Sequence, residues 1–175
     1  MKSFTATEAV VEHPDTFDRL MAANGAALAR LAGSYTHTAG DRDDLLQEIG
    51  LALWQALPNF RGECSPRTFL FRIAHNRAVA YLARSRARFP QAAEDYDVRD
   101  PASDPESGLA REQTAGRLRH AIHDLPLVYR QVITLALEDM GYSEIAEVLG
   151  ISESNVGARL TRARQLLRAA LEKNR

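Results

Sequence analysis

The chain reads Gly-Tyr-Ser-Glu-Ile-Ala-Glu-Val-Leu-Gly-Ile-Ser-Glu-Ser-Asn-Val from Gly141 to Val156. This stretch has the spacing of two short helices joined by a tight turn. Ala146 is small where the two helices would cross, and Gly150 suits a turn that needs a left-handed residue. Ser152 can cap the second helix. The stretch therefore predicts a helix-turn-helix.

The helix that follows this turn carries a cluster of positive charge. Its basic residues are Arg159, Arg162, Arg164 and Arg168, and its N-terminal end holds Ser152, Glu153, Ser154 and Asn155. Arginines bind phosphates, while the first residues of a recognition helix reach base edges in the major groove. This pattern favours duplex DNA binding. The alternative is a helical hairpin with a solvated basic face.

Charge is distributed unevenly along the chain, although the net charge is only −1. Residues 61–88 contain seven arginines and one acid, and residues 155–175 contain six basic residues and one acid. Between these blocks, residues 89–114 hold seven acidic and two basic residues. Two separate basic blocks indicate two contacts with a polyanion.

The apolar periodicity of the chain predicts helices, and no run alternates strictly as a strand would. We expect one helix from Pro14 to Gly33, weakened or kinked at Asn24-Gly25. A second is expected over residues 41–57 with Asp41 as its cap, and a third over about residues 66–88. The predicted fold is all-α. It has two small helical domains, residues 10–88 and 111–175, joined by a flexible acidic linker over residues 89–110.

The second of these helices is apolar on almost every side. Its apolar members are Leu45, Leu46, Ile49, Leu51, Leu53, Trp54 and Leu57, and its polar exceptions are Gln47, Glu48 and Gln55. A helix in a small domain buries only one face inside that domain. The remaining apolar surface either meets a partner protein or lies beneath neighbouring helices, and the residues alone favour neither reading.

Basic and aromatic residues interleave after that helix. They include Phe60, Arg61, Arg67, Phe69, Phe71, Arg72, His75, Asn76, Arg77, Tyr81 and Arg84. Cationic side chains hold phosphates while aromatic rings stack on exposed bases, which is the chemistry of single-strand binding. The pattern predicts such a surface here, although some of the rings must belong to the core.

The sequence gives little support to an enzyme. It lacks a Gly-rich phosphate loop and a nucleophile motif. Its histidines and its single cysteine, Cys64, have no partners at metal-ligand spacing, so we expect neither a metal nor a cofactor. No run of about 18 apolar residues is present, and the N-terminus has no secretory signal. We expect a cytoplasmic protein without membrane insertion.

Two sets of motifs resemble the extracytoplasmic-function sigma factors of bacterial RNA polymerase. The segments 44–57, 60–63 and 69–76 resemble the second conserved region of that family. Leu125-Pro126 and the segments 142–152 and 159–164 resemble its fourth region. The motifs follow the family's order and spacing over most of the chain.

The resemblance implies a sigma factor that binds core RNA polymerase, recognises promoter DNA, assists its melting and is commonly restrained by an anti-sigma factor. The residues that would dock on the polymerase are Asp44, Leu45, Gln47, Glu48 and Trp54. Those that would open and read the minus-ten element are Asn59, Phe60, Arg61, Arg72, Asn76 and Arg77. Those that would read the minus-thirty-five element are Ser152, Glu153, Ser154, Asn155, Arg159, Arg162 and Arg164.

The chain departs from the family at two positions of the recognition helix. Gly157 stands where the family usually has a basic residue, and Ala158 stands where it often has serine, so two usual DNA contacts are missing. Glycine also costs a helix about 1 kcal/mol relative to alanine. A stand-alone helix-turn-helix regulator is the rival interpretation. The basic block at 61–88 argues against it, because such a regulator has no need of a second basic surface.

Overall fold

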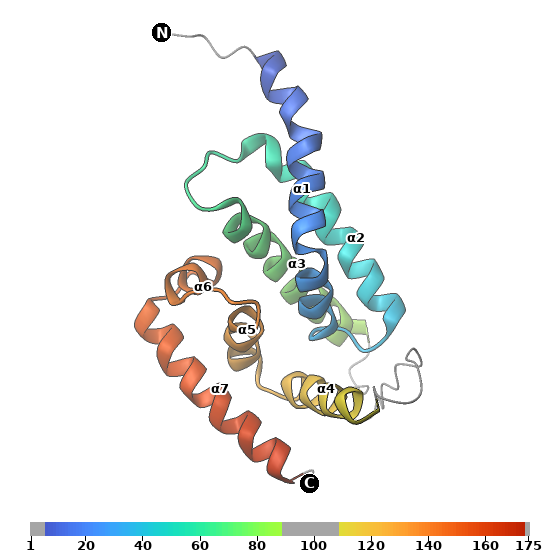
Figure 1. Ribbon diagram of the computed structural model, residues 1–175, viewed down its shortest axis with the longest axis vertical. Helices are drawn as coiled ribbons and strands as arrows, with labels where there is room; N and C mark the ends of the chain where they lie inside the picture. The colour runs from blue at the N-terminus through green and yellow to red at the C-terminus, as the bar shows by residue number, and fades with distance from the viewer. Residues whose placement is uncertain (1–5, 89–108, 174–175) are drawn as a thin grey trace.

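The computed structural model describes residues 6–88 and 109–173, and every element within them is helical. Helices α1 (Ala6–Gly33), α2 (Ala39–Ala56) and α3 (Pro66–Arg88) pack on one another, with a 3-10 turn, η1 (Leu57–Asn59), after α2. Helices α4 (Leu109–His123), α5 (Leu127–Ala136), α6 (Tyr142–Leu149) and α7 (Glu153–Lys173) form a second bundle (Figure 1). The all-α prediction is confirmed, whereas most of the predicted acidic linker lies outside the described residues.

Helix α1 differs from its prediction at its start and at its middle. It begins at Ala6 rather than Pro14, and it passes through Asn24 and Gly25 without ending. Asn24 is buried, and its amide donates to the Leu20 carbonyl at 2.9 Å while its oxygen accepts from Arg67 Nε at 3.3 Å. These hydrogen bonds satisfy the side chain without interrupting the helix. The helix therefore continues regularly through Asn24 and Gly25, where we expected it to weaken or kink.

Helix α2 begins with a different cap from the one predicted. Thr38 is the N-cap, because its hydroxyl accepts the Asp41 backbone N–H at 3.0 Å. Asp41 instead lies in the first turn, where its carboxylate accepts from the Thr38 hydroxyl at 2.7 Å. The positive end of the helix dipole still stabilises a carboxylate at this position.

The predicted helix-turn-helix is confirmed. Gly150 adopts the left-handed conformation at φ 66° between α6 and α7, a conformation that glycine reaches without strain. The Ser152 hydroxyl accepts the Asn155 backbone N–H at 3.2 Å and so caps α7. Ile145 and Val156 are fully buried at the junction. Helix α4, which precedes this unit, was not predicted from the sequence.

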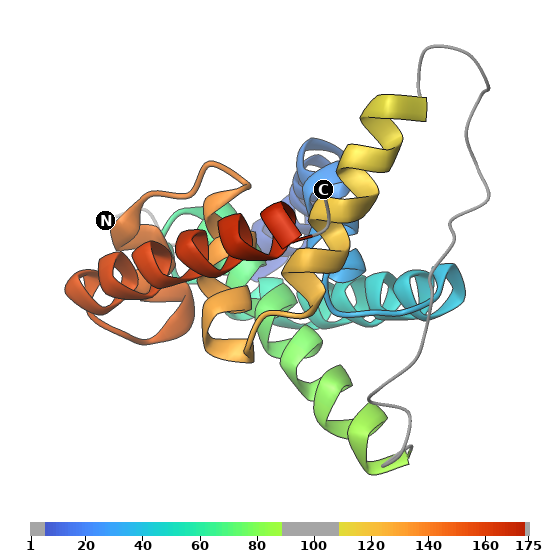
Figure 2. The same ribbon diagram turned by 90° about the horizontal axis from the view of Figure 1, so that it is seen from below.

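The two bundles touch one another. Helix α6 packs on α3, and the Arg30 side chain of α1 reaches Glu138, between α5 and α6. Figure 2, seen from below, shows α5 and α6 close to the N-terminal bundle, while the C-terminal end of α3 projects away from them. In the described residues, none of the helices has the length and apolar content that crossing a bilayer requires.

Candidate nucleic-acid interface

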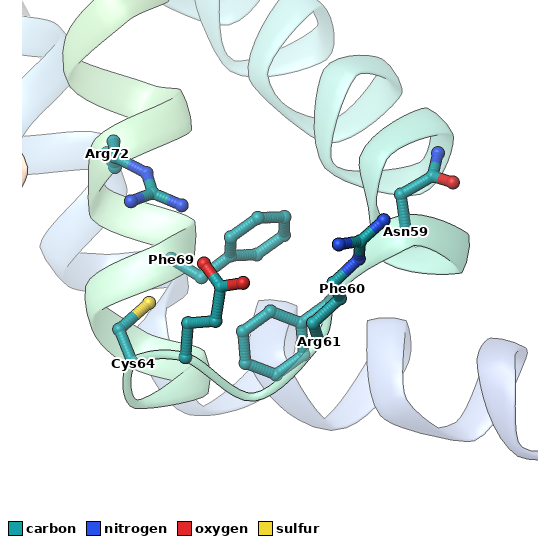
Figure 3. A pocket seen from close by; sticks show the side chains of 7 residues that line it. Asn59, Phe60, Arg61, Cys64, Phe69 and Arg72 are labelled. Atoms are coloured by element: carbon teal, nitrogen blue, oxygen red, sulfur yellow. The ribbon is translucent and has the colours of Figure 1, made fainter.

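A cavity of about 340 Å³ lies between the loop after α2 and the start of α3 (Figure 3). This volume is at the small end of the range for ligand pockets. Its lining residues are Asn59, Phe60, Arg61, Glu63, Cys64, Phe69 and Arg72. Four of these, Asn59, Phe60, Arg61 and Arg72, belong to the residues that the sequence assigned to the minus-ten element. The fold therefore gathers most of that predicted set around one space.

The loop that walls the cavity turns at Gly62, whose φ of 72° is left-handed and favours glycine. This turn brings Phe60 back toward Phe69 of α3, so that the two ring centroids lie 4.6 Å apart at a tilt of 38°. Arg72, nearly one helical turn after Phe69, places its guanidinium 5.6 Å from the centre of that ring. Two rings and a cation thus share one wall, an arrangement that can stack a flat base and hold a phosphate.

Asn76 and Arg77 lie further along α3 and do not line the cavity. Both side chains are exposed. Asn76 follows Arg72 by four residues, so the two share a face of the helix. They extend the polar surface of the cavity along α3, away from the loop.

Cys64 was not among the predicted site residues, yet it lines the cavity. Its thiol is partly covered, and burial raises its pKa. The negative charge of Glu147, on α6, raises that pKa further. The thiol therefore stays protonated at neutral pH, which disfavours a reactive role because the thiolate is the nucleophile.

The exposed face of α2 carries large apolar side chains. Leu51 is 59% exposed and Trp54 is 46% exposed. Phe17 of α1 meets Trp54 edge to face, with the ring centroids 5.4 Å apart. Asp44 and Gln47 are exposed on the same helix, whereas Glu48 is half-buried and pairs with Arg84 of α3 at 2.7 Å. Exposed apolar side chains beside polar ones are typical of a protein-docking surface.

Two features of this surface differ from the predicted docking set. Leu45 is fully buried in the bundle, so its side chain offers no surface to a polymerase in this arrangement, in contrast to the predicted contact. It faces inward because it starts the buried seam that continues through Ile49 and Leu53 at the helical spacing of four residues. Leu51 was left out of the set, although the apolar excess of the helix was the signal that could have found it.

The N-terminal end of α7 is open to solvent. Ser152, Glu153, Ser154 and Asn155 are all exposed, as are Arg162 and Arg164, whereas Arg159 is half-buried. At about 100° per residue, Arg162 and Arg164 project roughly 160° apart around the helix. The arginines therefore flank the buried seam of α7 on two sides and cannot all meet one DNA surface in the same way.

The comparisons with known proteins bear on both bundles. The family model of sigma-70 region 2 matches residues 20–88, and that of sigma-70 region 4 matches residues 115–167. The ECF RNA polymerase sigma-E factor of Haemophilus influenzae is 32% identical over 150 residues, which cover 79% of this chain and 79% of that protein. The chain belongs to the extracytoplasmic-function sigma factors. This ECF sigma factor therefore serves promoter-specific initiation of transcription by RNA polymerase.

Further relatives resemble this ECF sigma factor over nearly its whole length. The RNA polymerase sigma factor CnrH of Cupriavidus metallidurans is 32% identical over 176 residues, covering 95% of this chain and 92% of CnrH. The solved structure of CnrH in complex with the cytosolic domain of CnrY matches with a TM-score of 0.71, over 97% of this chain and 96% of that one. The sigma factor RpoE of Bartonella quintana, in complex with the anti-sigma factor NepR, is 18% identical with a TM-score of 0.71 and shares the fold.

The sites of this ECF sigma factor fall within the matched regions. The cavity and the exposed face of α2 lie in the region 2 match, and the helix-turn-helix lies in the region 4 match. The surface that gathers aromatic and cationic side chains is thus separate in sequence from the helix-turn-helix motif.

Proposed function

We propose that the cavity beside α3 captures an unstacked base of the minus-ten element during promoter melting. The observation that carries this proposal is the wall formed by Phe60, Phe69 and Arg72, which offers two rings and a cation to one base and its phosphate. Asn59 and Arg61 line the same space. Asn76 and Arg77 would then guide the strand along α3.

The exposed face of α2 is our candidate for docking on core RNA polymerase. Trp54 and Leu51 supply apolar area, and Asp44, Gln47 and Glu48 supply the polar rim. Tryptophan is enriched among residues that dominate binding energies at interfaces. This assignment replaces Leu45 by Leu51 in the predicted docking set.

The helix-turn-helix is our candidate for reading the minus-thirty-five element. Residues 152–155 would reach base edges from the open end of α7. Arg162 and Arg164 would hold phosphates on the two flanks of that helix. In this scheme residues 10–88 and 111–175 act as two DNA-binding domains and residues 89–110 connect them.

We infer that the protein acts by binding alone, without chemistry of its own, in the cytoplasm where the chromosome and polymerase reside. Within the described residues, no group of three or more potential metal ligands comes together. The solved relative CnrH is bound to the cytosolic domain of CnrY. By analogy, we propose that a protein partner restrains this chain by covering its docking or DNA-binding surfaces.

Transcription from genomic DNA tests the proposal directly. The purified protein is added to core polymerase, and transcript starts and complex formation are measured. Phe69→Ala and Arg72→Ala should lower promoter opening by a factor of roughly 5 to 150 while core binding is kept, because stacking is worth about 1–3 kcal/mol per base. Trp54→Ala should weaken core binding, so that promoter opening falls at low protein concentration and recovers when enough protein is added to saturate the polymerase. Loss of both properties in every variant would indicate misfolding and reject the separate roles.

A further inference from the structure

Helix α1 borders the exposed face of α2, and the two helices approach closely at Gly50. A Cβ atom added at Gly50 would lie 3.9 Å from the Met21 side chain and 4.0 Å from the Phe17 ring. Phe17 and Met21 are four residues apart and so share one face of α1, and Gly50 and Trp54 share one face of α2 in the same way. Because Gly50 has no side chain, this stripe of α1 packs over the α2 backbone.

Phe17 reaches Trp54 from this position. The two ring centroids are 5.4 Å apart and the ring planes meet at 88°, the edge-to-face geometry that the charge distribution of aromatic rings favours. Phe17 is half-buried and packs on the core, whereas Trp54 is 46% exposed. The core therefore holds the Phe17 ring, and the Phe17 ring supports one side of the indole.

Leu51 lies on the other side of Trp54 and is open to solvent. At about 100° per residue, Gly50 and Leu51 fall on opposite sides of Trp54 around the helix. Phe17 and Met21 pack beside Gly50, while Leu51 is 59% exposed. The indole is thus supported by α1 along one side and accessible to a partner from the side of Leu51.

Support of this kind affects affinity because binding costs conformational entropy. A tryptophan without neighbours samples several rotamers and gives up that freedom when a partner covers it. A ring that already rests in one orientation loses less, so the same contacts with the partner give tighter binding. The effect is largest at an aromatic anchor, because a few such residues carry most of the binding energy of an interface.

We propose that Phe17 is a positioning residue of the docking surface, whose ring holds the Trp54 indole in the orientation that core polymerase binds. The proposal rests on the proposed function of the exposed face of α2. Phe17 acts through Trp54 and makes no contact of its own with the polymerase. Helix α1 is then part of the docking apparatus, although the polymerase touches α2.

The orientation of Trp54 can be followed directly, because Trp54 is the only tryptophan in the chain. Its fluorescence in the free protein reports the indole alone. Phe17→Ala should shift the emission to longer wavelength, speed quenching by acrylamide and shorten the decay of fluorescence anisotropy. Circular dichroism of the same samples shows whether the helices remain folded.

Surface plasmon resonance on immobilised core polymerase measures the effect on docking. Phe17→Ala and Phe17→Leu should each weaken binding by a factor of roughly 2 to 12, because both remove the edge-to-face pair and Phe17→Leu keeps most of the apolar volume. The matched control is Met21→Ala, which removes an apolar side chain at the same helix crossing. It should lower the midpoint of urea unfolding while leaving the core affinity and the Trp54 emission unchanged.

The double variant Phe17→Ala/Trp54→Ala separates positioning from direct contact. If Phe17 acts through Trp54, its removal from a chain that already lacks Trp54 should leave the core affinity unchanged. The same loss of affinity in both backgrounds would overturn the proposal, since Phe17 would then touch the polymerase itself. Equal loss of affinity in Met21→Ala would also overturn it, because general destabilisation of the crossing would explain the effect.

Trp54→Ala alone tells the two proposals apart. If Trp54→Ala weakens core binding while Phe17→Ala and Phe17→Leu bind like the native chain, the positioning role is wrong and the docking role of α2 stands. If Trp54→Ala binds core polymerase as tightly as the native chain, the docking role of α2 fails and the positioning role fails with it. Weaker binding in all three variants, with no further loss in the double variant, supports both.

Discussion

Leu45 and Trp54 show how differently two apolar residues of one helix are used. Leu45 is fully buried, so Leu45→Ala should lower the free energy of unfolding by about 2–5 kcal/mol. Trp54 is half-exposed, so Trp54→Ala should cost less stability and more affinity for core polymerase. Denaturant unfolding and a binding titration with core polymerase measure the two effects. The assignment is contradicted if the Leu45 variant stays as stable as the native chain.

Gly157 is a second residue whose surroundings predict the effect of a substitution. It lies inside α7, and a Cβ atom added there would meet only the Tyr142 ring, at an ordinary 3.5 Å. Gly157→Ala should therefore raise the free energy of unfolding by up to about 1 kcal/mol, since glycine is the weaker helix former. Thermal or denaturant unfolding at neutral pH measures this gain. No gain would mean that the contact with Tyr142 costs as much as the helix gains.

Gly157→Lys tests the missing basic contact at the same position. The lysine should strengthen duplex binding and steepen its salt dependence by about one phosphate contact. Gly157→Ala is the matched control, because it restores the helix without adding charge. A salt slope equal to that of the alanine variant would show that position 157 does not face the DNA backbone.

At the scale of the element, α3 carries a histidine whose charge state depends on burial. His75 is 6% exposed, and burial lowers its pKa to about 4 from an ordinary 6.5. Its ring faces Gln131 of α5, which is uncharged. The ring therefore stays neutral in the folded protein at pH values where the ring of the unfolded chain already binds a proton.

The pH dependence of stability follows from this histidine. Its contribution is fully present above pH 6.5 and is lost as the pH falls toward 4, because the unfolded state binds more protons in that window. At pH 5 the loss should reach about 2 kcal/mol relative to pH 7. Urea unfolding at both values measures it, and His75→Gln should remove the part that belongs to His75. His123, whose pKa burial also lowers to about 4, should keep its own part of the pH dependence. An unchanged difference in that variant would place the effect on another group.

At the scale of the whole molecule, apolar packing and the ion pair between exposed Arg30 and buried Glu138 join the two bundles. Arg30 is 62% exposed, so salt should screen its attraction to Glu138. Raising the salt concentration from 50 to 500 mM should therefore reduce the contribution of this pair to the free energy of unfolding, which urea unfolding at both salt concentrations measures. Glu138→Gln, which lacks the charge, should show a smaller change. A change of equal size in both proteins would assign the salt effect to other contacts.

Features that depend on neighbours along the chain could be predicted from the amino-acid sequence. The helix-turn-helix follows from Ala146, the left-handed Gly150 and the Ser152 cap, all of which act within a few residues. The alternation of basic and aromatic residues likewise predicted a nucleic-acid surface around α3. The interruption that the sequence predicts in α1 does not occur. One reason is that the Asn24 side chain accepts a hydrogen bond from Arg67, which is 43 residues away.

The packing of the helices had to be known to see which apolar residues of α2 are buried, which side chains enclose the cavity and how the bundles meet. Leu45 and Leu51 look alike in the sequence, yet neighbouring helices cover the first and leave the second exposed. Arg30 and Glu138 are 108 residues apart and carry no local sign of pairing. Their contact exists because packing of α6 on α3 brings them together and removes water from the carboxylate, and local sequence patterns encode neither step.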